Sequence, residues 1–174
     1  MAPNDEAVIA QTKAWLVKDV IGLNLCPFAR EVHAADRIRY RVSDARDAAT
    51  LQAHLKEEAL RLSGAPAAQT ETTLVIHPHI LGDFLAYNDF LDVADQTLED
   101  LGLTGVLQVA SFHPCYVFAG TEPDDVTNFT NRSPYPMLHL LREESVERAV
   151  ASYPDVDKIS ERNMETMRRL KGGL

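Results

Sequence analysis

The chain has 174 residues, of which 45% are apolar and 25% charged, and its net charge is −9. This length suits one domain with its own core, so we expect residues 1–174 to form a single globular domain. The acidic balance, with no Lys/Arg-rich run, argues against nucleic-acid binding. No apolar run is long enough to cross a membrane, and residues 1–7 lack a signal-peptide pattern, so we expect a cytoplasmic protein without a membrane partner.

The first helix is predicted by apolar residues at helical spacing from about Asp5 to Ile21. Pro27 favours the first position of a second, short helix, which would place Cys26 at the N-cap. There the helix dipole would stabilise a thiolate, which makes Cys26 the candidate reactive thiol. The alternative is that Cys26 is a small buried side chain in a turn.

Strands and helices alternate in the pattern between residues 37 and 110. We expect strands at Arg37–Val42, Thr72–Ile76 and Gly105–Ala110, separated by helices that begin near Asp44 and Asp83. Such alternation is typical of parallel strands joined by right-handed helical crossovers.

After residue 110 the chain passes through a long irregular segment, 112–136, in which Tyr116–Phe118 are expected to form a fourth strand. Apolar spacing then predicts a helix from Pro136 to Pro154 and a final helix from about Val156. The expected fold class is α/β, with a small three- or four-stranded, mainly parallel sheet. About five helices would cover it in a two- or three-layer arrangement.

Two strands are followed by similar motifs, IHPHI and FHPCY, which contain His77 and His113. If these strands are parallel neighbours, both histidines lie at the carboxyl edge of the sheet, where open α/β sheets bind ligands. One interpretation pairs Cys26 as a nucleophile with His113 as the acid/base. Alternatively, both histidines are hydrogen-bonded residues that end their strands.

A metal site is a further interpretation, because His77, His79, His113 and Cys115 are zinc-compatible ligand types. However, alternate residues of an extended chain point to opposite sides, and the spacing is unlike that of common structural zinc motifs. We therefore assign no metal ligand.

An anion site is indicated by Asn131, Arg132 and Ser133, which follow Asn128 within the irregular segment. Arginine presents a planar fork of donors that matches carboxylate or phosphate groups. The alternative is that Arg132 ties the segment down by binding backbone carbonyls, or that it pairs with Asp124 or Asp125.

Several long motifs run through the chain: GLNLCPFA at 22–29, TTLVIHP at 72–78, VASFHP at 109–114, NRSPYPMLHLLRE at 131–143 and ERN at 161–163. Together they resemble a bacterial family known only as a domain of unknown function, number fourteen-fifteen. The resemblance covers nearly the whole chain. It implies a bacterial protein but no particular activity or cofactor. His79 and Cys115 depart from the family pattern, which weakens the four-ligand metal interpretation.

The sequence as a whole predicts a protein that binds a small anionic ligand at the carboxyl edge of its sheet, under the 112–136 loop. The expected catalytic residues are Cys26 and His113, which would make the protein a thiol-dependent hydrolase or transferase. Competing hypotheses are a non-catalytic interaction or regulatory domain and a histidine-based metal-binding protein. The expected ligand-binding residues are His77, Asn128, Asn131, Arg132 and Ser133.

Overall fold

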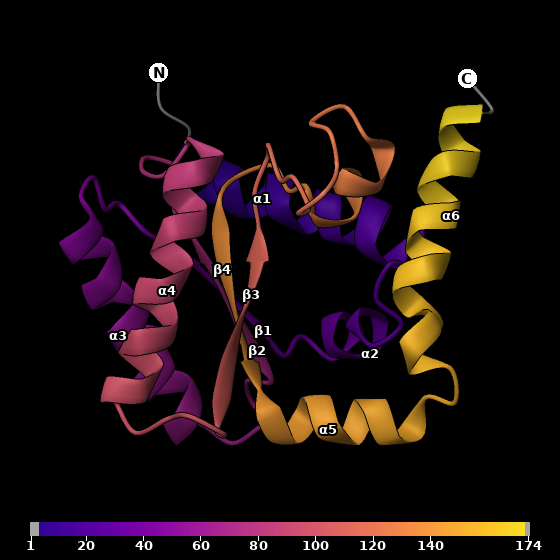
Figure 1. The fold of residues 1–174 in the computed structure, drawn as a ribbon. Coiled ribbons are helices and arrows are strands. Elements are labelled where there is room, and N and C mark those ends of the chain that lie inside the picture. The colour runs from indigo at the N-terminus through magenta and orange to yellow at the C-terminus, as the bar shows by residue number, and fades with distance from the viewer. Residues whose placement is uncertain (1–3, 173–174) are drawn as a thin grey trace.

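The computed structural model describes residues 4–172, and a four-stranded sheet forms its centre (Figure 1). The strands lie side by side in the order β1, β2, β4, β3. Their bounds are Ile38–Val42 for β1, Thr72–Ile76 for β2, Leu107–Phe112 for β3 and Met137–Arg142 for β4.

The α/β class is confirmed, but the expected mainly parallel sheet is wrong. β1 and β2 pair in parallel, whereas β4 lies between β2 and β3 and runs antiparallel to both. β1, β2 and β3 consequently still point the same way. Ile76 and Phe112, the last residues of β2 and β3, both pair with Met137. His77 and His113 therefore lie at the same carboxyl edge of the sheet, as expected, but their strands are not the expected neighbours because β4 lies between them.

Helices cover both faces of the sheet (Figure 1). On one face, α3 (Ala48–Gly64) and α4 (Phe84–Asp100) pack on β-strand residues such as Val75 and Leu138. On the other, α1 (Asp5–Trp15), the π-helix η1 (Leu16–Ile21) and α2 (Ala29–Ala34) lie over the residues of the opposite pleat. Each helix of the described chain is too short or too polar to cross a membrane.

Side-chain caps fix where the long helices begin. The carboxylate of Asp47 accepts from the backbone N–H of Thr50, and that of Asp83 accepts from Ala86. These bonds satisfy N–H groups that have no partner within the helix. Asp83 thus starts α4 beside the carboxyl end of β2, which sets the direction of the β2–α4 connection.

The C-terminal third differs most from the prediction. Residues 137–142 form β4 instead of a helix, and Tyr116–Phe118 are not a strand. The MLHLLR sequence of β4 is apolar on both faces because helices or loop residues cover both sides of this strand, so it lacks the alternation of a half-exposed strand. Three helices follow: α5 (Glu143–Ser152), the short 3-10 helix η3 (Val156–Lys158) and α6 (Ile159–Gly172).

Candidate functional site

His77 and His113 are both fully buried at the carboxyl edge of the sheet. His77 Nδ1 lies 3.1 Å from the carbonyl oxygen of Ile80, and His113 Nε2 lies 3.0 Å from that of Leu81. A carbonyl only accepts, so each imidazole donates to it. The two histidines therefore hold the β2–α4 connection, where Leu81 has a positive φ of 59°.

Tyr87 of α4 packs against both histidine rings, with centroid distances of 5.9 Å to His77 and 4.9 Å to His113. Its hydroxyl donates to the carbonyl of Met137 at 2.8 Å and accepts from the N–H of Phe112 at 3.0 Å. Tyr87 thus joins the start of β4 to the end of β3. Aromatic packing fills this part of the edge.

The buried environment keeps both histidines neutral. Burial lowers the pKa of His77 to about 4 and also lowers the pKa of His113. His113 Nδ1 accepts from the backbone N–H of Cys115 at 2.9 Å, so both nitrogens of His113 are engaged within the chain. The geometry matches the interpretation of strand-ending, hydrogen-bonded histidines and leaves His113 no free nitrogen for proton transfer.

Cys26 is not an N-cap residue, which corrects the prediction. α2 begins at Ala29, and Cys26 lies in the preceding turn, partly buried. It packs beside Leu16, Val20 and Ile21, on the α1 face of the sheet. His113 packs against Tyr87 and Phe84 of α4 on the opposite face, so the structure does not bring Cys26 and His113 together.

The four residues of the metal interpretation do not converge either. Among residues 4–172 no three His, Cys, Asp or Glu side chains come close enough together to hold a metal ion.

Three of the four predicted anion-binding residues of the loop bind the loop itself. The amide oxygen of Asn128 accepts from the N–H of Phe118 at 2.9 Å. Asn131 donates to the carbonyl of Ser111 at 3.1 Å, and the hydroxyl of Ser133 donates to that of Tyr135 at 2.7 Å. These bonds order the 112–136 loop, including the 3-10 helix η2 (Val126–Asn131).

Arg132 also ties the loop down, but only in part. Its Nε donates to the carbonyl of Tyr116 at 3.1 Å, and one terminal nitrogen donates to that of Pro123 at 2.6 Å. The guanidinium carbon lies 4.7 Å from the ring centre of Phe129. Among the described residues, no carboxylate lies within the 4.0 Å that defines an ion pair with Arg132.

A groove of about 450 Å³ runs past Arg132, and we call it the loop groove. Its walls come from α1 and η1, from the 112–136 loop and from α6, which surround the top of the sheet in Figure 1. Trp15 touches Phe112 at the end of β3, with ring centroids 5.3 Å apart, which places the groove beside the carboxyl edge. Its apolar lining residues are Trp15, Leu23, Val126, Phe129, Met167 and Leu170, and its charged ones are Asp19, Asp124, Arg132 and Lys171.

The sequence interpretation missed the walls that lie outside the loop. Trp15 of the first predicted helix is partly exposed and lines the loop groove with Asp19 and Leu23. These three residues are four apart in sequence. A carboxylate in the middle of an otherwise apolar helical stripe is the signal that could have revealed this wall.

The structure thus defines a mixed α/β domain with a ligand-sized groove beside the carboxyl edge of its sheet. The chain belongs to the family described as protein of unknown function (DUF1415), whose model matches residues 7–173. No curated protein and no solved structure matches it.

Proposed function

We propose that this protein binds a small anionic ligand in the loop groove and that Arg132 is the anion-binding group. The observation that carries this proposal is the state of Arg132, which is half-buried, oriented and without an acidic partner among residues 4–172. Partly buried cations are normally paired, because removing a charge from water is costly.

The donor inventory of Arg132 supports this role. A guanidinium has five N–H donors, and the backbone carbonyls of Tyr116 and Pro123 take two of them. The remaining donors are free to bind the two oxygens of a carboxylate or phosphate. Because the carbonyls and the Phe129 ring already fix the side chain, binding would cost little further side-chain ordering.

The proposal is for binding and not for thiol chemistry. Cys26 lies on the face of the sheet opposite to His113, and the buried imidazoles serve the chain's own backbone. The groove has the volume and the mainly apolar lining of a small-molecule site, with few charged groups.

The proposal is tested with 3-phenylpropanoate and its uncharged analogue 3-phenylpropanamide. Trp15 is the only tryptophan and lines the groove, so its fluorescence reports binding directly. We expect the acid to bind at least about tenfold more tightly than the amide, because a hydrogen bond to a charged group contributes roughly 1.5–3 kcal/mol. Equal binding of acid and amide to the unmodified protein would contradict the proposal.

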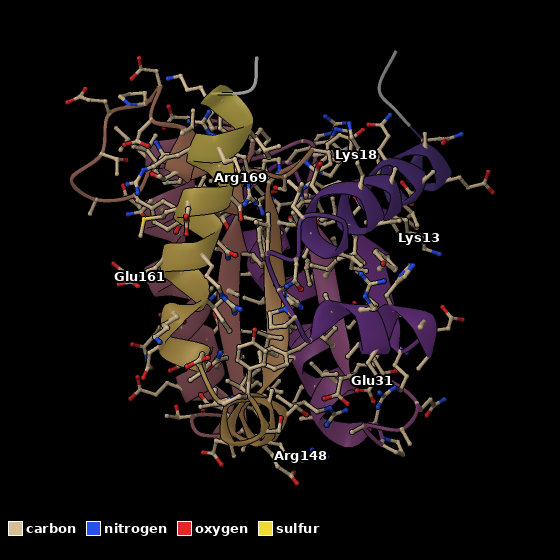
Figure 2. All side chains as sticks on the ribbon, turned by 90° about the vertical axis from the view of Figure 1, so that its right-hand side faces the viewer. Lys13, Lys18, Glu31, Arg148, Glu161 and Arg169 are labelled. Carbon is tan, nitrogen blue, oxygen red and sulfur yellow. The ribbon has the colours of Figure 1, made fainter. Side chains whose placement is uncertain are left out.

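Arg132→Gln should remove the preference for the acid, whereas Arg169→Gln should retain it. Arg169 is an exposed arginine of α6 that does not line the groove, so it controls for the change in net charge (Figure 2). Arg132→Lys retains the charge without the fork, and we expect it to recover part of the preference. Near-UV circular dichroism of each variant checks that the loop remains packed.

A further inference from the structure

Asp19 is the second half-buried charge in the wall of the loop groove. It comes from η1, is half-buried, and has no ion-pair partner within 4.0 Å among residues 4–172. Asp19 and Arg132 line the same groove, yet they do not form an ion pair with each other. Two opposite charges that face one groove without meeting suit a ligand that carries both complementary charges.

The other two charges of the groove carry less weight. Asp124 and Lys171 are exposed, so water and salt screen them more strongly than the half-buried pair. Even so, they bring the groove to two acidic and two basic side chains, so it offers partners for a cationic group as well as for an anionic one.

The rest of the lining is apolar. Trp15 and Leu23 come from the α1–η1 wall, Phe129 from the loop and Met167 from α6. A volume of about 450 Å³ falls in the range of small-molecule sites and exceeds what the charged part of a small ligand would fill. The ligand should therefore carry an apolar group as well as its two charges.

From this arrangement we propose that the ligand of the loop groove is a free α-amino acid with a large apolar side chain. Arg132 would bind its carboxylate, Asp19 its ammonium group, and the apolar wall its side chain. This inference rests on the proposed function, because it keeps Arg132 as the anion-binding group and adds the ammonium and apolar recognition.

The test compares four probes by Trp15 fluorescence: L-phenylalanine, 3-phenylpropanoate, which lacks the ammonium, 2-phenylethylamine, which lacks the carboxylate, and glycine, which lacks the side chain. We expect L-phenylalanine to bind most tightly, about tenfold better than each of the others, since each loses one charge-assisted contact or the apolar contact.

Asp19→Asn should weaken L-phenylalanine binding about tenfold and leave 3-phenylpropanoate binding unchanged or slightly stronger. The matched control is Asp89→Asn, because Asp89 is an exposed carboxylate of α4 on the far side of the sheet. A loss of affinity confined to probes with an ammonium group distinguishes recognition by Asp19 from a loss of fold.

The outcomes separate the two proposals. If 3-phenylpropanoate binds through Arg132 but at least as tightly as L-phenylalanine, the amino-acid inference is wrong and the anion-binding function stands. If glycine binds as well as L-phenylalanine, apolar recognition is wrong. If neither L-phenylalanine nor 3-phenylpropanoate binds, both proposals fail.

Discussion

A single hydroxyl group, that of Tyr87, joins two strands at the carboxyl edge of the sheet. The hydroxyl of Tyr87 serves the carbonyl of Met137 and the N–H of Phe112 at once, from within a fully buried side chain. Such a group contributes more through what its loss leaves unsatisfied than through its own bond energy. The stability of the carboxyl edge of the sheet therefore depends on a few hydrogen bonds that cannot be identified from the amino-acid composition.

Tyr87→Phe should lower the free energy of unfolding by about 1–3 kcal/mol, because it removes the hydroxyl that pairs with the buried carbonyl of Met137 and the partly buried N–H of Phe112. Urea unfolding measures this change. Tyr135→Phe is the control, since its hydroxyl donates to Gln11 at the surface, and we expect a smaller loss there. Equal effects of the two substitutions would contradict the role given to Tyr87.

Glu58 is the other residue whose surroundings decide its effect. Glu58 belongs to α3, and its side chain is fully buried. Its carboxylate accepts hydrogen bonds from Arg39 of β1 at 2.7 and 3.0 Å, and Arg41 lies 3.7 Å away. The hydrogen bond to Glu58 raises the pKa of Arg39. The arginine face of β1, which alternation alone identifies only as polar, is thus covered by a buried acid.

Glu58→Gln should destabilise the fold towards the lower end of the roughly 3–5 kcal/mol found when one partner of a buried ion pair is removed, since the arginines remain partly exposed. Glu57→Gln, one position along α3, removes only an exposed pair with Arg61 and should change stability by less than about 1 kcal/mol. Thermal unfolding of the two variants side by side gives the comparison. A harmless Glu58→Gln substitution would show that Arg39 and Arg41 need no partner.

At the level of elements, the sequence predicts best where periodicity and caps agree. α4 begins after Asp83, and β1 and β2 lie within or at the predicted segments. The sequence predicts a helix where β4 lies. Both faces of this strand are buried, so its sequence lacks the alternation of polar and apolar residues that identifies a half-exposed strand. Because β4 is predicted as a helix, the prediction also lacks an antiparallel strand between β2 and β3.

The candidate site was predicted in part for a similar reason. Arg132 was singled out because its chemistry is local to the loop, but the opposite walls come from η1 and α6, far away in sequence. Asp19 becomes meaningful only when folding brings it to the same groove as Arg132. Long-range juxtaposition of this kind has no signal in a single sequence.

η1 is the element that shapes the wall of the groove, and Gly22 ends it. A Cβ at Gly22 would clash with the backbone oxygen of Lys18, which cannot move aside as a flexible side chain would. The π-helical bonds here include the one from the Gly22 N–H to the carbonyl of Val17, at 3.0 Å. π-Helices are rare in proteins, and those that occur are often found at functional sites. The position of η1 in the wall of the loop groove agrees with that tendency.

Gly22→Ala should therefore distort η1, lower the free energy of unfolding by about 1–3 kcal/mol and shift the fluorescence of the adjacent Trp15. In Gly64→Ala, at the end of α3, the new Cβ meets nothing within 4 Å, so we expect stability to be unchanged or slightly raised. Chemical denaturation followed through Trp15 measures both effects. An unchanged spectrum and midpoint for Gly22→Ala would show that η1 tolerates the clash.

For the whole molecule, two neutral histidines, the buried His77 and the partly buried His139, limit stability at acidic pH. Burial lowers the pKa of His77 and of His139 from 6.5 to about 4. His77 Nε2 has no hydrogen-bond partner among the described residues, and His139 Nε2 lies 2.6 Å from the hydroxyl of Thr72. Protonation would thus place a charge on the buried His77, which follows β2, and on the partly buried His139 of β4.

The direction follows from proton linkage. Between pH 6.5 and about 4 the unfolded chain binds more protons at these histidines than the folded chain does, so stability falls as the pH is lowered through this window. The loss levels off below about pH 4, where both states are protonated. At 1.36 kcal/mol per pKa unit, each histidine contributes at most roughly 3 kcal/mol. Asp47 and Asp125, whose pKa is lowered by hydrogen bonds to Thr50 and Thr127 respectively, lose their contribution only below this window.

His77→Asn should flatten the fall in unfolding free energy between pH 7 and 4.5, because asparagine can still donate to the carbonyl of Ile80 but does not bind a proton. The slope is the quantity to compare, since the absolute stability at pH 7 also changes with the lost packing against Tyr87. His33→Asn, in the short helix α2, is the control for replacing a histidine elsewhere in the chain. Urea unfolding at a series of pH values measures this slope. The same slope in His77→Asn and in the unmodified protein would mean that groups other than His77 cause the loss of stability at acidic pH.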